Sequence, residues 1–216
     1  GLGDVYKRQA EVLKNLTGEK TDQEDAWKSV YLNYIETNTQ IEDPEKGTHR
    51  EIYKLLDLNE DGVPELYINF GSTAGGDAIL SYFNGEIVEQ KMDNYGFRYI
   101  EGANLFRDSG GHMDEYYDKI YTLENGNFVL LYSGEYGAED NSKVEYGDDG
   151  MPVYQYFWEN EEVSSEEEYD RKLNEVYDTE KEVNIFLDAQ YDSGRGRYVG
   201  NGLCDYQEIT EAIEAY

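Results

Sequence analysis

The chain has 216 residues, of which 48 are acidic and 18 basic, giving a formal net charge of -30 at pH 7. This excess of negative charge repels the phosphates of nucleic acids and anionic membrane surfaces, which argues against nucleic acid as a partner. The content of 14% aromatic residues, including 22 Tyr, is too high for a disordered acidic segment, so we expect a folded chain.

The length and the cysteine count predict one domain without a disulfide bond. A chain of 216 residues suits a single core, and the lone Cys204 excludes an intrachain disulfide. Residues 1–9 resemble translated sequencing-adapter sequence, so we expect a non-native leader there and one domain over residues 10–216. No run is long and apolar enough for a transmembrane segment. No signal peptide opens the chain, so an exported precursor would have been truncated.

The first predicted element is an amphipathic helix over residues 22–38. Apolar side chains recur there at spacings of three and four residues, among them Trp27, Tyr31 and Ile35. Beyond this helix the pattern changes to a period of two, which predicts a β region over residues 50–163.

The segment from Asp57 to Glu65 carries the clearest chemical signal. Its oxygen-bearing side chains stand at alternate positions, as a hard divalent cation requires, and Gly62 permits the sharp turn that would bring them together. The predicted Ca²⁺ ligands are Asp57, Asn59, Asp61, Val63 (through its carbonyl) and Glu65. Position 12 of the loop, where an EF-hand carries a bidentate Glu, is Ile68.

The segments on either side decide which kind of loop this is. Residues 65–70 alternate apolar and polar side chains, which predicts a strand, whereas residues 50–56 fit either a strand or one face of a helix. We favour a strand there. Helices on both sides of the loop would instead make an EF-hand, which is the alternative. The alternative to a metal site is an Asx-rich turn that binds nothing, since Asp, Asn and Gly also cluster in turns.

The pattern D-x-[DN]-x-D-G-x-x-[DE] between two strands resembles the calcium loops of FG-GAP and VCBS-type repeats in secreted and surface proteins. Glu65 stands where those repeats usually carry Asp. The motif occurs once, so a complete propeller is not expected. The wider pattern, a Trp-bearing helix followed by this loop, Asn-Gly hairpins and a later helix, resembles secreted lipoproteins of bacteria. That resemblance implies an extracellular or cell-envelope location and no known activity.

Turn sequences further along predict a meander of antiparallel hairpins. Asn84-Gly85 and Asn125-Gly126 each join two runs of alternating apolar residues, and both residue types accept the positive φ that tight hairpins need. Further turn signals over residues 147–160 continue the series to residue 163.

The C-terminal region, residues 164–216, is predicted to be mainly helical. One helix is capped by Ser164 or Ser165 and ends near residue 177, and a last one runs over residues 205–215.

Two stretches between these helices are less regular. Residues 181–190 fit no single pattern, and residues 194–202 are expected to form a loop. The expected fold class is α+β, mainly antiparallel β, with helices near the N-terminus, at about residues 165–177 and at the C-terminus.

No catalytic residue is predicted. Residues 108–111 (DSGG) resemble the nucleophile segment of trypsin-like proteases, yet no companion His or Asp motif precedes them, and we expect a flexible Gly turn. Adjacent acidic pairs such as Asp114-Glu115 and Glu139-Asp140 are expected at solvated edges, because neighbours in a strand point to opposite faces.

Aromatic residues offer a second candidate surface. Flat rings with polar edges stack on sugar rings or anchor protein partners, although the same residues also form the packing and cross-strand pairs of a sheet. The candidate ligand-binding residues are Tyr116, Tyr132, Tyr136, Tyr154, Tyr156, Trp158 and His112.

These features predict a secreted or cell-surface module, stabilised by Ca²⁺, that binds carbohydrate or protein and is not an enzyme. The alternative is an extracellular hydrolase that acts on glycans or cell-wall polymers with paired carboxylates. A deep pocket holding two carboxylates, one of raised pKa, would favour the enzyme. A broad exposed aromatic face would favour the binding module.

Overall fold

The computed structural model describes residues 25–38, 41–43, 48–49, 51–71, 75–92, 97–186 and 189–216. The expected leader at residues 1–9 and the first residues of the expected helix 22–38 lie outside this part. Over the described ranges the chain is an α+β structure made mainly of antiparallel strands, as predicted, with neither a closed barrel nor a propeller.

The first sheet has four strands in the order β3-β4-β5-β6, each antiparallel to its neighbours. They are β3 (Ile52–Leu56), β4 (Glu65–Asn69), β5 (Asp77–Phe83) and β6 (Glu86–Met92). The Asn84-Gly85 turn joins β5 to β6 with positive φ at both residues, as predicted. A strand precedes the 57–64 loop and a strand follows it, so the EF-hand alternative is wrong.

The second sheet has seven strands in the order β12-β11-β10-β9-β8-β7-β13. They are β7 (Phe97–Ile100), β8 (Leu105–His112), β9 (Glu115–Glu124), β10 (Asn127–Gly137), β11 (Gln155–Trp158), β12 (Glu161–Val163) and β13 (Glu182–Asn184). β7 to β12 follow one another as the predicted meander. β13 returns after a helix and pairs with β7 at the far edge.

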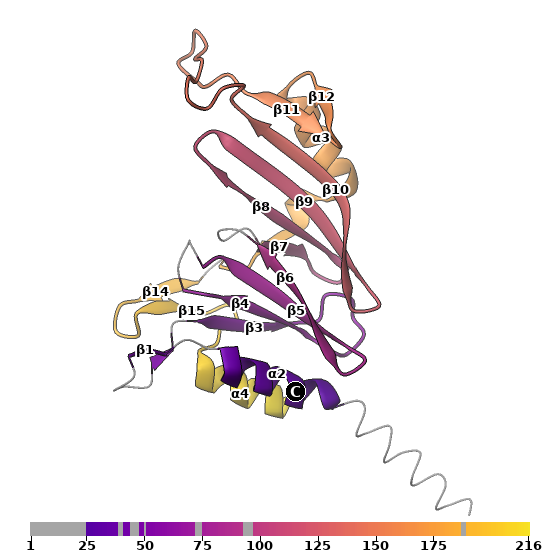
Figure 1. Cartoon of the computed structure of the whole chain (residues 1–216), viewed down its shortest axis with the longest axis vertical. Coiled ribbons are helices and arrows are strands. Elements are labelled where there is room, and N and C mark those ends of the chain that lie inside the picture. Colours follow the sequence, from indigo (N-terminus) through magenta and orange to yellow (C-terminus); the bar gives the residue numbers. More distant parts are fainter. Residues whose placement is uncertain are drawn as a thin grey trace, which may run out of the picture.

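Helices cover one face of each sheet (Figure 1). They are α2 (Ala26–Asn38), α3 (Glu166–Val176) and α4 (Tyr206–Ala215). α2 and α4 lie side by side against the four-stranded sheet, and α3 packs on the seven-stranded sheet. Ser165 caps α3 by accepting a hydrogen bond from the Glu168 N–H, and Asp205 forms a capping box with Glu208 at the start of α4. No described helix is long and apolar enough to cross a membrane.

Short elements complete the described chain. They are the paired strands β1 (Ile41–Asp43) and β2 (Thr48–His49), a 3-10 turn (Thr179–Lys181), and the paired strands β14 (Gln190–Asp192) and β15 (Arg197–Val199).

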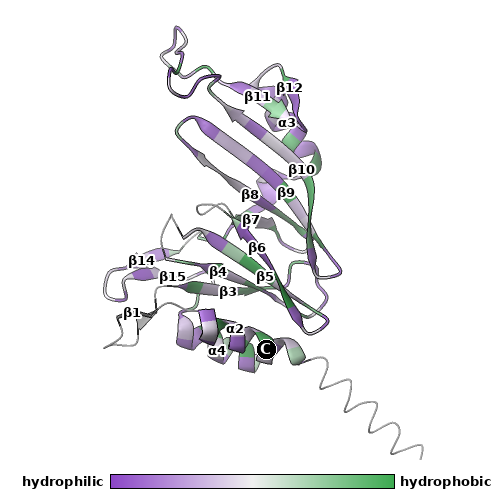
Figure 2. Ribbon diagram, viewed as in Figure 1, coloured by the Kyte–Doolittle hydropathy of each residue, from purple (hydrophilic) through white to green (hydrophobic). Residues whose placement is uncertain are grey.

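The central strands of the four-stranded sheet are buried on both faces, because their side chains alternate between two hydrophobic layers. On β4, Leu66 and Ile68 pack against α2 and α4, whereas Tyr67 faces the second sheet. On β5, Leu80 packs in the helix layer and Ile79 faces the second sheet. Figure 2 shows hydrophobic residues along the central strands of this sheet. The two sheets and the helix pair therefore stack as layers.

Aromatic rings fill the layer between the sheets. Phe97 lies 5.3 Å from Tyr67 and 5.6 Å from Phe106, and Phe106 stacks on Tyr121 at 5.0 Å, all measured between ring centroids. A third cluster lies beneath α3 and is built from Ile100, Ile120, Trp158, Val163, Tyr169, Leu173 and Tyr177.

Two predictions about loops are wrong. Residues 108–111 are not a flexible turn, because they lie within β8 and pair with β9. A Cβ atom added at Gly110 would lie 2.9 Å from the Tyr117 hydroxyl, so this glycine makes room for a ring on the neighbouring strand. The expected loop at 194–202 contains β15, which completes a small hairpin.

Candidate functional site

The side-chain oxygens of the predicted calcium loop are turned into the loop itself. Asp57 Oδ1 accepts a hydrogen bond from the Asp61 N–H at 3.1 Å, and Asp57 Oδ2 accepts one from the Gly62 N–H at 3.1 Å. Asp61 Oδ1 accepts from the Val63 N–H, and Asp61 Oδ2 from the Asn59 side-chain amide, both at 2.8 Å. Gly62 has a φ of 84°, the left-handed conformation that favours glycine. One turn therefore gathers Asp57, Asn59 and Asp61.

Glu65, the fourth side chain of the predicted set, opens β4 and is only 2% exposed. Its Oε2 accepts a hydrogen bond from the Leu58 N–H at 3.0 Å. Burial raises the pKa of Glu65 to about 8, and the nearby charges of Asp61 and Asp57 add to this, while the Leu58 N–H opposes it. Glu65 therefore holds its proton up to about pH 8, and a cation bound beside it would favour its charged form.

The loop is fixed to the helical layer through Tyr31 of α2. This buried hydroxyl donates to the carbonyl oxygens of Pro64 at 3.0 Å and Leu80 at 3.2 Å. Burial raises the pKa of Tyr31, and the charges of Glu65 and Asp61 raise it further. The loop is therefore part of the packed structure.

The donor set fits a hard cation such as Ca²⁺ in kind, since every predicted ligand atom is an oxygen. A carboxylate has about four acceptor positions, so the hydrogen bonds within the loop leave capacity for an ion. Across the described ranges, no three His, Cys, Asp or Glu side chains are already gathered around a point that suits a metal. An ion held by Asp57 and Asp61 would therefore need the amide oxygen of Asn59, backbone oxygen or water as further ligands.

The six candidate aromatic residues come together at the distal end of the seven-stranded sheet. Tyr136 stacks on Tyr116 at 5.1 Å and on Tyr156 at 5.7 Å, and Tyr154 lies 5.9 Å from Tyr116. Tyr132 stacks on Trp158 at 6.4 Å.

This aromatic group lies on the face that α3 covers. Tyr169 of α3 packs edge-on against Tyr136 at 5.4 Å and against Trp158 at 5.6 Å. Trp158 is 7% exposed, whereas Tyr132 is 36% exposed. The rings thus mainly hold the helix to the sheet, which is the packing role that the sequence left open beside ligand binding.

His112 lines one cleft together with two of these rings, Tyr116 and Tyr136. It pairs with Glu115 across β8 and β9, whereas the adjacent Gly111 pairs with Tyr116. Gly111 has a φ of 127°, so regular strand alternation does not hold at this point of β8.

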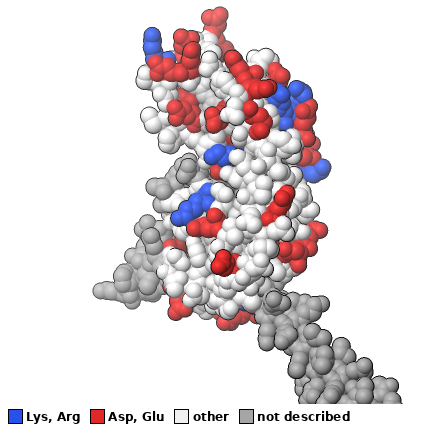
Figure 3. Space-filling model, turned by 45° about the vertical axis from the view of Figure 1, so that its right-hand side comes forward, with Lys and Arg blue, Asp and Glu red and all other residues white. Residues whose placement is uncertain are grey.

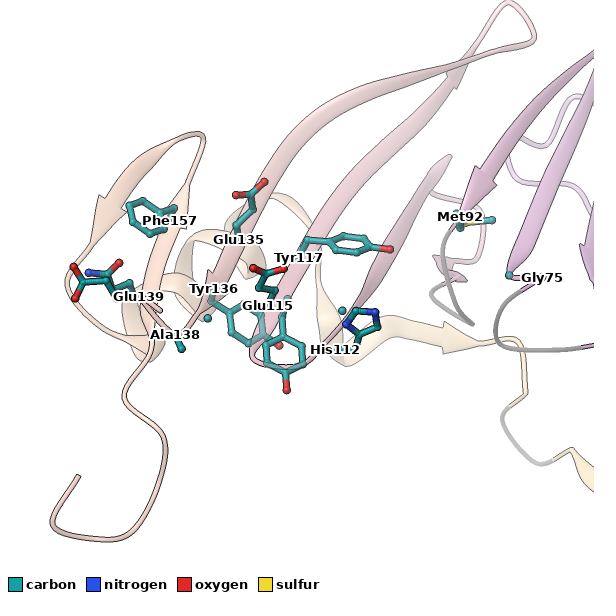
Figure 4. Close-up of a pocket in the computed structure, with 15 residues that line it drawn as sticks. Gly75, Met92, His112, Glu115, Tyr117, Glu135, Tyr136, Ala138, Glu139 and Phe157 are labelled. Carbon is teal, nitrogen blue, oxygen red and sulfur yellow. The ribbon is translucent and has the colours of Figure 1, made fainter. Parts of the chain in front are cut away.

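A cleft of about 670 Å³ lies on the face that carries His112 (Figure 4). Figure 4 shows Phe157, Glu135 and Tyr117 following one another across the strands, with Glu115 and His112 beside them. The volume falls within the range of small-molecule sites. Sequence reasoning did not single out Glu135 or Phe157. The only available signal was their alternation with the tyrosines of the other face.

Charge is unevenly distributed around the molecule. Figure 3 shows acidic side chains spread over the upper and lower parts of one face, with the basic side chains confined to a few places. The cleft is also acidic, because Glu115, Glu135 and Glu139 line it and no Lys or Arg does so among the described residues.

Two buried carboxyl groups lie between the sheets, Asp77 on β5 and Asp108 on β8. Asp77 is 1% exposed, and its Oδ1 accepts a hydrogen bond from the Asn69 side-chain amide at 2.7 Å. Burial raises the pKa of Asp77 to about 7, and Asp108 adds to this, while Asn69 and Tyr67 lower it. Asp108 is 4% exposed and lies 3.4 Å from the Tyr117 hydroxyl, measured to its Oδ1.

Comparison with family models, with curated proteins and with solved structures finds no match to this chain.

Proposed function

We propose that this chain is a calcium-stabilised, non-catalytic binding module that acts outside the cell or at its surface. The observation that carries the proposal is the convergence of Asp57, Asn59 and Asp61 within one turn beside the buried Glu65. A hard cation there would neutralise acidic groups that otherwise repel one another. With no disulfide available, ion binding supplies the cross-link between β3 and β4.

The extracellular location is supported by the chemistry of the loop. Weak calcium sites of extracellular modules work where calcium is abundant, and a surface with a net charge of -30 remains soluble there. The resemblance to secreted and surface proteins points the same way. Carbohydrate or protein at the cell surface is the partner class that this proposal names.

Thermal unfolding with and without calcium tests the proposal. An acidic turn that binds no ion would keep the same hydrogen bonds, so the calcium-dependent shift in Tm is the discriminating quantity. Saturating Ca²⁺ at about 100 times Kd should stabilise the folded chain by about 2.7 kcal/mol, and chelator should reverse this. Asp61→Ala should abolish the shift. Asp148→Ala, in the exposed turn at residues 147–150, should retain it. An unchanged Tm in the parent chain would reject the calcium site.

The hydrolase alternative is supported by one pair of carboxyl groups, those of Asp77 and Asp108. They are two carboxyl groups close enough to interact, one has a raised pKa, and the cleft-lining Tyr117 touches the other. A glycosidase needs two carboxyl groups, one of them protonated, on either side of the bond it cleaves, whereas both of these groups are buried behind the cleft lining. Screening polysaccharides with the parent chain and with Asp77→Asn decides between them. If the parent chain hydrolyses a polysaccharide and Asp77→Asn does not, the chain is an enzyme and not only a binding module.

A further inference from the structure

One row of side chains runs across four strands on the face of the seven-stranded sheet that carries the cleft. Pairing sets Gly110 beside Tyr117, Tyr117 beside Glu135, and Glu135 beside Phe157. Directly paired residues share a face, so a carboxylate stands between two aromatic rings, and the Tyr117 ring lies over Gly110 at the end of the row. Figure 4 shows Phe157, Glu135 and Tyr117 in this order.

Two further glutamates enlarge the negative charge of the cleft. Glu115 pairs with Gly137, two positions beyond Glu135 on β10, and such diagonal neighbours lie about 7–8 Å apart. Glu139 follows the end of β10 and lines the same cleft. Within the described chain, none of the three glutamates forms an ion pair. The side-chain amide of Asn141 donates one hydrogen bond to Glu115, at 2.8 Å.

The spacing of these carboxylates favours an extended cation over a metal ion. The described side chains gather no three acidic or imidazole groups around one point suited to a metal, so the charges of this cleft lie along it. The Tyr117 ring already contacts an alkylammonium group, since Lys119 Nζ lies 4.8 Å from its centroid. A ligand with several ammonium groups on an aliphatic stem would meet carboxylates and rings in alternation.

A buried polar atom lies behind the inner end of the cleft, outside its lining. Asp77 follows Gly76 and pairs with Met92, and both of these residues line the cleft. Its Oδ2 is buried without a hydrogen bond of normal length to any described residue, although the Tyr67 hydroxyl and the Phe97 N–H lie near it. Asp77 faces the seven-stranded sheet, as does Ile79 on the same strand. An acceptor is therefore present behind the lining.

We propose that this cleft binds a linear organic polycation, with alkylammonium groups held by Glu115, Glu135 and Glu139. Ammonium groups form charge-assisted hydrogen bonds with carboxylates, and the aliphatic stem packs on Tyr117 and Phe157. The inference rests on the proposed function as a binding module and names its ligand class. Free polyamines and lysine side chains of a peptide share this chemistry.

Calorimetric titration of the full chain with spermine tests the inference, with an acetylated, amidated tetralysine peptide as the second arm. Binding by either ligand supports the cleft, and the tighter of the two identifies the source. Glu135→Gln should weaken binding at least fivefold. Glu124→Gln, at the exposed end of β9, makes the same change in net charge, from -30 to -29, and should weaken it less than twofold. Equal weakening in both variants, or no heat with either ligand, would overturn the inference.

Two controls are needed. One tests whether ionic screening alone explains the displacement of spermine, and the other tests whether spermine binding depends on the calcium site. Magnesium chloride at equal ionic strength should displace spermine far less effectively than tetralysine does, and equal displacement would also overturn the inference. The titration is repeated with calcium and with chelator. A calcium-dependent Tm without spermine binding leaves the proposed module intact and removes only its ligand class. Spermine binding without a calcium effect removes the loop proposal and leaves the cleft.

Discussion

Asp57 fixes the conformation of Gly62: its Oδ2 accepts the Gly62 N–H at 3.1 Å, across a turn in which Gly62 has a φ of 84°. The carboxylate reaches five residues ahead, and its other oxygen accepts a hydrogen bond from the Asp61 N–H, so Asp57 ties the start of the turn to its end. The geometry of the loop therefore depends on this pair.

Substituting Gly62 tests that dependence. Gly62→Ala would place a Cβ where no atom lies within 4 Å, so its cost is the left-handed backbone, about 1–2 kcal/mol. Gly85→Ala is a matched control, since Gly85 has a φ of 91° and equally open space in the hairpin of β5 and β6. Denaturant unfolding should report similar losses of stability in both variants. Only Gly62→Ala should also reduce the calcium-dependent gain. If calcium stabilises the two variants equally, the conformation of this turn does not affect ion binding.

Local signals in the sequence predicted much of this fold. The Asn-Gly turns and the cap of α3 rest on residues close together in the chain, and these elements are confirmed. The pairing of β13 with β7 was not predictable, because it joins distant segments whose contact depends on where α3 ends. The glycines of β8 misled for a related reason. Gly110 makes room for Tyr117, a neighbour only in the folded sheet.

Asp77 should make stability depend on pH. Its pKa of about 7 in the folded chain lies above the usual value of 3.8, so the folded state holds the proton more tightly than the unfolded state. This contribution is fully present below about pH 4 and is lost as pH rises through about 7. Asp77→Asn should be more stable than the parent at pH 8, by on the order of 2 kcal/mol, and the difference should vanish toward pH 4.

Urea unfolding from pH 4 to 8 measures this profile. Asp148→Asn, in an exposed turn, is the control for loss of one charge and should run parallel to the parent chain. A constant difference between Asp77→Asn and the parent over that range would show that Asp77 does not titrate as described.

Tyr169 should be a strong point of attachment for α3. Its hydroxyl donates to Asp118 Oδ2 at 2.7 Å, and Arg107 lies 3.4 Å from the other oxygen of the same carboxylate. Tyr169→Phe removes the donor and leaves a buried acceptor partly unsatisfied, which costs about 1–3 kcal/mol. Tyr191→Phe, on an exposed ring, should change stability by less than about 0.5 kcal/mol. Similar losses in the two variants would contradict the role given to this hydrogen bond.

The candidate sites were predictable to different degrees. The calcium loop is contiguous, so the spacing of Asp57, Asn59 and Asp61 alone indicated that they could meet. The cleft is built from β8, β9, β10 and β11, and Glu135 comes to lie between Tyr117 and Phe157 only through strand register. The tyrosine spacing indicated a shared face, yet gave no sign that Tyr169 of α3 would cover it.

The most direct test of the calcium loop is a crystal structure of the chain grown with calcium, with anomalous data to locate the ion. We expect one Ca²⁺ in the turn between β3 and β4, bonded at about 2.3–2.6 Å to side-chain oxygens of Asp57, Asn59 and Asp61. A turn with no anomalous peak at saturating calcium, and with these three side chains directed into solvent, would contradict it.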